Sequence, residues 1–286
     1  MALAALFVGA LAMGISPVFV RNAEVGPFAS AFWRVALALP VLFLWARLAR
    51  EETAEAPTAG SHRALILAGL FFAGDLIFWH LAIGHTSIAN ATFFACLAPF
   101  WVAVLSRVTI GEAVPRQTVI GLAICLPGAG LLIFHSASDG GGNWIGDLYG
   151  IATSFFFGLY FLVMRGARRH FGAGAATLRS TLVTALALLV AAVISGEAFL
   201  PDTLTGAANL LALGVVSHAG GQGLLSIALG VLSASFSSLV IFVEAVAAAL
   251  FAWIFAGEPI GALQMAGGVL ILFGLWIARP RATPKT

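Results

Sequence analysis

Long apolar stretches take up most of this sequence, and polar segments too short to form a domain separate them. A helix that crosses the hydrocarbon core of a bilayer needs about 20 mostly apolar residues. Ten stretches approach that length, so we expect an all-α integral membrane protein with ten transmembrane helices. The expected helices lie at 2-20, 28-46, 63-83, 88-107, 115-134, 148-168, 174-195, 206-230, 233-256 and 260-278.

Composition agrees with this interpretation and excludes several classes of function. Of 286 residues, 61% are hydrophobic and 9% are charged, whereas a soluble domain has about 25% charged residues. The single lysine, Lys285, lies beside the C-terminal residue, so no Walker A loop or Schiff-base lysine can be built. Pumping driven by ATP hydrolysis on this chain alone is therefore excluded.

The remaining composition predicts no cofactor and no metal site. Cys96 and Cys125 lie within apolar stretches and lack the spacing of a metal site or a disulfide framework. The net charge of +2 is spread over several loops, which argues against a nucleic acid partner. The expected partners are the lipid bilayer and a small molecule.

Positive charges predict the orientation in the membrane, because lysine and arginine near helix ends are retained in the cytoplasm. One side of the predicted topology has only Arg21. Two arginines, Arg34 and Arg179, lie within expected helices. We therefore expect both termini to be cytoplasmic. The other side carries Arg47, Arg50, Arg63, Arg107, Arg116, Arg165, Arg168, Arg169, Arg279, Arg281 and Lys285.

An internal repeat predicts how the helices are organised. Residues 74-84 read GDLIFWHLAIG and residues 220-230 read GGQGLLSIALG, a shift of 146 positions. The same shift without a gap pairs Gly111 and Glu112 with Gly257 and Glu258, so both copies end in a Gly-Glu turn followed by a helix. Because five helices are an odd number, the second half would enter the membrane from the opposite side, which is an inverted repeat.

The predicted division of the chain follows from this repeat. It comprises a first five-helix half at 1-134, an external linker at 135-147, a second half at 148-278 and a cytoplasmic tail at 279-286.

Four segments carry a resemblance to a known family. They are the early arginine in FASAFWRVALALP, the run LAIGHTSIANATFFACLAPFWVAVLS, the Gly-Glu turns, and the segment VEAVAAALFAWIFAGEPIG. The sequence resembles the EamA-type ten-helix members of the drug/metabolite transporter superfamily, and its aromatic-rich third and fourth helices look most like the YddG-type bacterial aromatic amino acid exporters. The resemblance implies two inverted bundles around a central cavity, alternating access, export of small metabolites and a location in the bacterial inner membrane.

Ionisable residues at membrane depth are costly and usually face a cavity or a partner. Glu244 lies near the middle of the helix expected at 233-256. It is either a cavity carboxylate that binds a substrate amine or titrates during transport, or a hydrogen-bonded residue that locks helices together. We favour the cavity, since the repeat mate of Glu244 is Ala98 and a substrate site breaks the symmetry.

The third expected helix carries an acid, an indole and an imidazole. Asp75 and Trp79 are four residues apart and His80 follows, which puts the three side chains on one broad face. An aromatic face can stack on an apolar ligand and hold a cation over its ring. The alternative for Trp79 is the aromatic belt at the membrane interface.

A polar stripe marks the eighth expected helix, where His218, Gln222 and Ser226 recur every four residues. Glycines at such a place let helix backbones pack closely, or they unwind the helix so that its carbonyl groups line a cavity. We favour close packing. The interleaved glycines are Gly220, Gly221 and Gly223.

Four other ionisable residues fit structural roles better than binding roles. Arg34 and Arg179 could clamp a carboxylate, but each lies near a helix start, from which its long side chain can reach the interface. Glu112 and Glu258 follow glycines at helix starts, where a negative charge suits the helix dipole.

A zwitterionic amino acid would find all its partners among the predicted site residues. Glu244 would accept its ammonium group, His80 with Gln222 would donate to its carboxylate, and Trp79 with Trp101 would form the apolar wall. The complete predicted substrate-binding set is Ser16, Asp75, Trp79, His80, Asn90, Trp101, Tyr160, His218, Gln222 and Glu244.

Two rival interpretations remain at this point. An intramembrane enzyme would need a GxSG serine or a GxGD aspartate, but no GxSG occurs, and Phe72, Ala73 and Gly74 precede Asp75. We therefore predict that the protein is not an enzyme. The second rival keeps transport but changes the cargo to drugs, purines or a lipid-linked sugar. Coupling to protons is left open.

Overall fold

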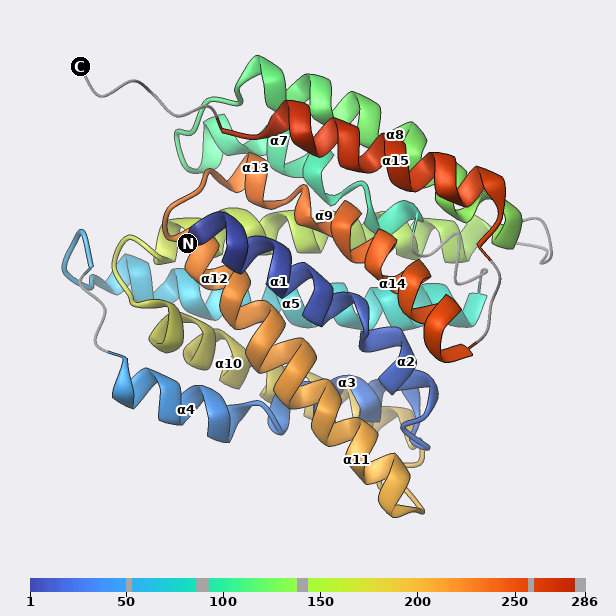
Figure 1. The fold of residues 1–286 in the computed structure, drawn as a ribbon. Coiled ribbons are helices and arrows are strands. Elements are labelled where there is room, and N and C mark those ends of the chain that lie inside the picture. Colours follow the sequence, from blue (N-terminus) through green and yellow to red (C-terminus); the bar gives the residue numbers. More distant parts are fainter. Residues whose placement is uncertain (50–52, 86–92, 138–143, 257–259, 281–286) are drawn as a thin grey trace.

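The computed structural model describes residues 1–49, 53–85, 93–137, 144–256 and 260–280, and within these ranges it is helical without any strand. Figure 1 shows the helices as a bundle in which most elements run in roughly the same direction or its reverse. The described parts of the expected apolar stretches are therefore mostly helical, as expected of a chain in lipid, which must satisfy its backbone groups within the segment itself.

Several apolar stretches are split into shorter helices that follow one another along the chain. The elements are α1 (Ala2–Gly14), α2 (Ser16–Arg21), α3 (Pro27–Ala36), α4 (Leu39–Leu48), α5 (Ala59–His85), α7 (Ala98–Thr109), α8 (Arg116–Ala137), α9 (Trp144–Ala167), α10 (Ala173–Ser195), α11 (Leu204–Ala212), the π-helix η1 (Leu213–Gln222), α12 (Gly223–Leu229), α13 (Ala234–Ser237), α14 (Val240–Ala256) and α15 (Ala262–Ala278).

Within the described residues, seven helices, some of them interrupted, are long and apolar enough to cross a membrane. Each agrees with an expected helix to within about four residues at either end. Three further apolar helices of the described residues, Phe93–Thr109, Arg116–Leu132 and Ala262–Ala278, are shorter than these seven. The protein is therefore a multi-pass membrane protein of the all-helical class. The spans are Ala2–Arg21, Pro27–Leu48, Ala59–Ala82, Trp144–Ala167, Ala173–Ser195, Leu204–Leu229 and Ala234–Phe255.

Prolines explain two of the helix breaks. Proline lacks a backbone N–H and its ring clashes with the carbonyl of the preceding turn. The break between α1 and α2 lies at Ile15, just before Pro17, and the break between α3 and α4 at 37–38 precedes Pro40. Such interruptions leave backbone groups inside the bundle, where a cavity or a neighbouring helix can satisfy them.

Glycines allow the closest helix contacts, most clearly where α8 packs on α15. A Cβ atom added to Gly121 would lie 2.5 Å from the carbonyl oxygen of Gly274, and one added to Gly267 would lie 2.5 Å from that of Gly128. Such backbone approach is typical of helix packing in membranes, where small residues take the place of hydrophobic burial.

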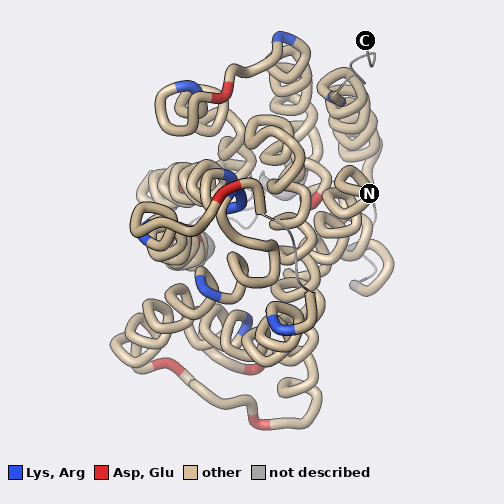
Figure 2. Tube along the Cα trace, turned by 90° about the vertical axis from the view of Figure 1, so that its left-hand side faces the viewer, with Lys and Arg blue, Asp and Glu red and all other residues tan. Residues whose placement is uncertain are grey.

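One end of the bundle holds both termini, at the left of Figure 1. The connections that follow α4, α7, α9 and α12 also lie at this end, which we call the termini end. Figure 2 looks onto it and shows that charged residues occupy few positions along the chain.

Candidate functional site

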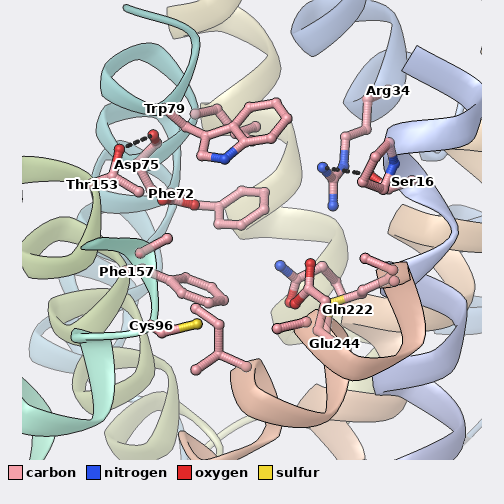
Figure 3. A pocket seen from close by; sticks show the side chains of 18 residues that line it. Ser16, Arg34, Phe72, Asp75, Trp79, Cys96, Thr153, Phe157, Gln222 and Glu244 are labelled. Carbon is pink, nitrogen blue, oxygen red and sulfur yellow. Dashed lines mark hydrogen bonds between the residues drawn. The ribbon is translucent and has the colours of Figure 1, made fainter. Parts of the chain in front are cut away.

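A central cavity of about 110 Å³ lies among α1, α2, α3, α5, α9, η1 and α14. Its residues on α5 lie in the middle and the C-terminal half of that helix, and its residues on α14 lie in the first half and the middle of that helix; Figure 3 shows the lining side chains. Irregular points of the helices supply lining positions, since Ser16 begins α2 after a break and Gln222 ends η1, where the π-helix passes into α12. The cavity has room for several water molecules, each of which needs about 10–15 Å³. It is lined by Met13, Gly14, Ser16, Pro17, Arg34, Phe72, Asp75, Leu76, Trp79, Ala95, Cys96, Thr153, Phe157, Gln222, Ile241, Glu244, Ala245 and Ala248.

Three charged side chains share this cavity: Arg34, Asp75 and Glu244. Arg34 is 9% exposed and Asp75 is 8% exposed. The negative charges of Glu244 and Asp75 act on Arg34, yet within the described residues neither carboxylate forms an ion pair or a hydrogen bond. The cavity therefore holds charges of both signs that the protein itself leaves unpaired.

The start of α3 is held in place by contacts with the segment after α10. The backbone N–H of Phe28 donates to Glu197 Oε2 at 3.0 Å, and Trp33 Nε1 donates to the carbonyl of Phe199 at 2.7 Å. Pro27 occupies the first turn, where its missing N–H costs nothing. These contacts fix the helix that carries Arg34.

Aromatic rings form one wall of the cavity. Trp79 and Phe72 come from α5 and Phe157 from α9. The ring of Phe72 is backed by Tyr160 at 5.1 Å and by His218 at 5.5 Å between ring centroids. This wall offers flat apolar surface to a ligand, with polar groups of the second layer directly behind it.

Fewer side chains of α5 face the cavity than the sequence predicts. Asp75 and Trp79 line the cavity together, but His80 does not. Its Nδ1 lies 2.6 Å from the carbonyl oxygen of Leu76 in its own helix, and its ring packs against Phe28. The reason is geometric, because adjacent residues of a helix point about 100° apart.

The residues of the polar stripe, His218, Gln222 and Ser226, also have different surroundings. All three of its members are buried, but only Gln222 lines the cavity. His218 Nε2 lies 2.9 Å from Thr181 Oγ1, and the Ser226 carbonyl accepts a hydrogen bond from Arg168. The π-helix places the stripe differently from a regular helix, since it closes its hydrogen bonds one residue later.

Two of the three interleaved glycines, Gly221 and Gly223, allow close packing. A Cβ atom at Gly221 would lie 2.5 Å from the Met13 side chain, and one at Gly223 would lie 2.9 Å from the ring of Trp45. A bulkier residue at either position would therefore push α1 or α4 away from this helix.

Of the other predicted site residues, Ser16 lines the cavity. Trp101 lies elsewhere, where its Nε1 donates to Ser154 Oγ at 2.9 Å. Tyr160 lies behind Phe72 and is 3% exposed. Asn90 falls outside the described residues, as does Glu258.

Sequence reasoning assigned Arg34 a structural role at the interface, and the structure corrects this. The side chain does not reach the interface but is buried in the cavity, where its Nη1 donates to Ser16 Oγ at 3.3 Å. The position of Arg34 within an apolar stretch was the sequence signal that could have revealed its place in the cavity. Arg179, by contrast, is outside the cavity, with its guanidinium 4.8 Å from the centre of the Phe171 ring.

Glu112 is likewise more than a helix-start residue. It lies four residues before α8 and its Oε1 accepts from Arg165 Nε at 2.6 Å, while Oε2 accepts from the backbone N–H of Ala234 at 3.0 Å. Arg165 Nη1 also donates to the carbonyl of Leu229 at 2.7 Å. This clasp of Glu112 and Arg165 joins the α7–α8 turn, the end of α9 and the α12–α13 break at the termini end.

The described residues contain no group of three histidine, cysteine, aspartate or glutamate side chains that could hold a metal ion.

A multi-pass helical bundle whose broken helices surround a polar cavity at membrane depth has the architecture of a small-molecule carrier. The chain belongs to the EamA-like transporter family, which matches residues 1–134 and 144–279. The predicted resemblance to this family is thus confirmed, and the protein belongs to a class of transporters rather than enzymes.

Relatives and a solved structure extend this result. The chain is 30% identical over 210 residues to the pseudopaline exporter CntI of Pseudomonas aeruginosa, covering 73% of this chain and 72% of that protein. It is 26% identical over 277 residues to an uncharacterized transporter of Archaeoglobus fulgidus, covering 96% and 95%. A crystal structure with 18% identity aligns with 97% of this chain at a TM-score of 0.80, which shows the fold alone.

These relatives support a small-molecule exporter. They do not support the finer resemblance to YddG-type aromatic amino acid exporters.

Proposed function

We propose that this protein exports amino acid-like metabolites, aromatic ones among them, by alternating access. Its place would be the bacterial inner membrane, with both termini in the cytoplasm. The observation that carries the proposal is the cavity itself, where the unpaired carboxylate of Glu244 lies opposite an aromatic wall. An ammonium group needs such an acceptor, and an apolar or aromatic side chain needs such a wall.

We assign a separate role in cargo binding to each of several lining residues. Glu244 would accept the ammonium group, Trp79 and Phe72 would contact the side chain, and Gln222 would add hydrogen bonds. Asp75 and Glu244 are the two carboxyl groups at the cavity that can exchange a proton, so either would be the site of proton coupling. His80 and Trp101 are not needed in this arrangement, because neither lines the cavity.

Alternating access would use the two five-helix halves proposed from the repeat. Two contacts between α8 and α15 support this proposal, namely Gly121 with Gly274 and Gly128 with Gly267. The repeat shift of 146 positions pairs Gly121 with Gly267 and Gly128 with Gly274. Exchanging the two halves of the chain therefore exchanges one contact for the other. That exchange is what a two-fold axis between the halves requires.

A second candidate cargo comes from the relatives. The similarity to a protein named as a pseudopaline exporter favours pseudopaline or a comparable metabolite. Transport by the same cavity is common to both candidates, and only the cargo differs.

Uptake into liposomes tests the proposal. Purified protein is reconstituted and offered radiolabelled amino acids, pseudopaline and cationic dyes, with and without an imposed pH gradient. We expect amino acid uptake that Glu244→Gln reduces about tenfold at low substrate, as loss of a charged hydrogen bond in a desolvated site implies. A response to the gradient would indicate proton coupling.

The matched control is Asp202→Asn, which neutralises an exposed carboxylate far from the cavity lining. It should transport like the wild type. Uptake of pseudopaline or dyes without any amino acid would overturn the proposed cargo and favour the second candidate or drug efflux.

A further inference from the structure

Arg34 has more hydrogen-bonding capacity than its surroundings use. A guanidinium group has five N–H donors and no acceptor. Within the described residues, Ser16 Oγ accepts one bond from Nη1 at 3.3 Å, and the buried Nε has no partner. A buried arginine without a matching anion is costly in a protein interior and at membrane depth.

The free donors point into the cavity. Figure 3 shows the guanidinium of Arg34 directed toward the side on which Gln222 and Glu244 lie. No carboxylate of the described residues pairs with it, although Asp75 and Glu244 both line the same space. The protein therefore keeps its positive and negative groups apart across a space that a ligand can occupy.

We propose that Arg34 binds the carboxylate of the cargo while Glu244 binds its ammonium group, so that the transported species is a zwitterion with both groups. This inference rests on the proposed function and assigns the anion site to a residue that sequence reasoning placed elsewhere. The planar guanidinium matches a carboxylate in a two-bond arrangement, which a histidine or an amide cannot offer. Ser16 acts as a positioning residue, because its hydroxyl accepts from Nη1 and orients the fork.

A carboxylate fits this site better than a phosphate. Arg34 is the one cation among the lining residues, and two carboxylates share the cavity with it. A phosphate group carries up to two negative charges and would meet those carboxylates with only one positive charge in compensation.

The test compares three ligands that differ in one charged group each. Uptake of radiolabelled L-phenylalanine into proteoliposomes is measured alone and against unlabelled phenethylamine, which lacks the carboxylate, and 3-phenylpropionate, which lacks the ammonium group. We expect the wild type to prefer phenylalanine to either competitor by about tenfold or more. Arg34→Gln should raise the KM for phenylalanine about tenfold and remove the preference over phenethylamine. The Arg34→Gln variant should keep the preference over 3-phenylpropionate. The Glu244→Gln variant should lose the preference over 3-phenylpropionate and keep the preference over phenethylamine.

The control is Arg179→Gln, which removes an arginine of α10 that lies outside the cavity. It should keep the wild-type KM and both preferences. If Arg34→Gln does not fold, as judged by size-exclusion chromatography, Arg34→Lys keeps the charge but loses the fork. Its KM for phenylalanine should then rise, and an unchanged KM would overturn the inference.

The experiment distinguishes a wrong role for Arg34 from a wrong proposed function. If the wild type carries phenylalanine and Arg34→Gln retains the preference over phenethylamine, Arg34 only stabilises the fold and the proposed function stands. If the wild type carries no amino acid, both proposals fall.

Discussion

Trp79 and His80 are neighbours in the chain but have different surroundings. The indole of Trp79 faces the cavity beside Asp75, whereas the imidazole of His80 bonds to the carbonyl of its own helix. The same separation holds for Gln222 and His218, of which only Gln222 lines the cavity. At the scale of residues, the site therefore depends on which way each side chain points around its helix axis.

This difference predicts unequal effects of two alanine substitutions. Trp79→Ala removes part of the cavity wall and should reduce uptake of an aromatic cargo about tenfold at low substrate, because burial of an aromatic ring contributes about 1–3 kcal/mol. His80→Ala should change uptake less than threefold. Initial rates in proteoliposomes, normalised to reconstituted protein, measure both. An equal loss in the two variants would mean that His80 reaches the cargo.

Among elements, the broken helices matter most for the site. Ser16 lies at such a break, Arg34 lies in the last turn before another, and Gln222 lies where the π-helix η1 passes into α12. Interrupted helices expose backbone and polar side chains at membrane depth only where protein or a cavity can satisfy them. At the termini end, the clasp of Glu112 and Arg165 fastens a turn of the first half of the chain to helix ends of the second half.

The clasp of Glu112 and Arg165 predicts that substitutions of its two residues have non-additive effects on stability. Both side chains are largely buried, with 18% exposed for Arg165 and 16% for Glu112. Glu112→Gln and Arg165→Gln should each lower the Tm of the purified protein, because each leaves a buried charge without its partner. The double variant should lose clearly less than the sum, since contacting residues couple by about 0.5–3 kcal/mol.

Thermal unfolding in detergent, followed by tryptophan fluorescence, measures these shifts. Arg107→Gln is the matched control, because Arg107 is exposed at the same end. Additive losses would show that Glu112 and Arg165 act separately.

At the scale of the whole molecule, both termini and four connections share one end of the bundle. Eleven of the positively charged residues belong to this side of the predicted topology and one to the other. Because such asymmetry is typical of a cytoplasmic location for the richer side, we predict that this end faces the cytoplasm.

Reporter fusions test that orientation. A reporter joined after Thr286 and another inserted near Glu52 should both be active as cytoplasmic fusions, because an even number of crossings separates the ends. Parallel fusions to a reporter active only outside the cytoplasm serve as the control. If either site proves external, the helix count or the orientation is wrong.

Much of the fold follows from local properties of the sequence. Hydropathy over about 20 residues predicted the spans, because lipid imposes a helix on any apolar segment that crosses it. The depth of Asp75 and Glu244 followed in the same way, since position along a helix sets position in the membrane. The family resemblance was also carried by short motifs and is confirmed over residues 1–134 and 144–279.

Only the tertiary structure decided which polar groups meet. Arg34 belongs to the cavity and His80 does not, because helix breaks and neighbouring helices set the direction of each side chain. Glu112 reaches Arg165 across 53 positions of sequence, a contact that no local pattern predicts. The sequence by itself determined which segments can cross the membrane and at what depth Asp75 and Glu244 lie, whereas packing determined that Arg34 faces them across the cavity.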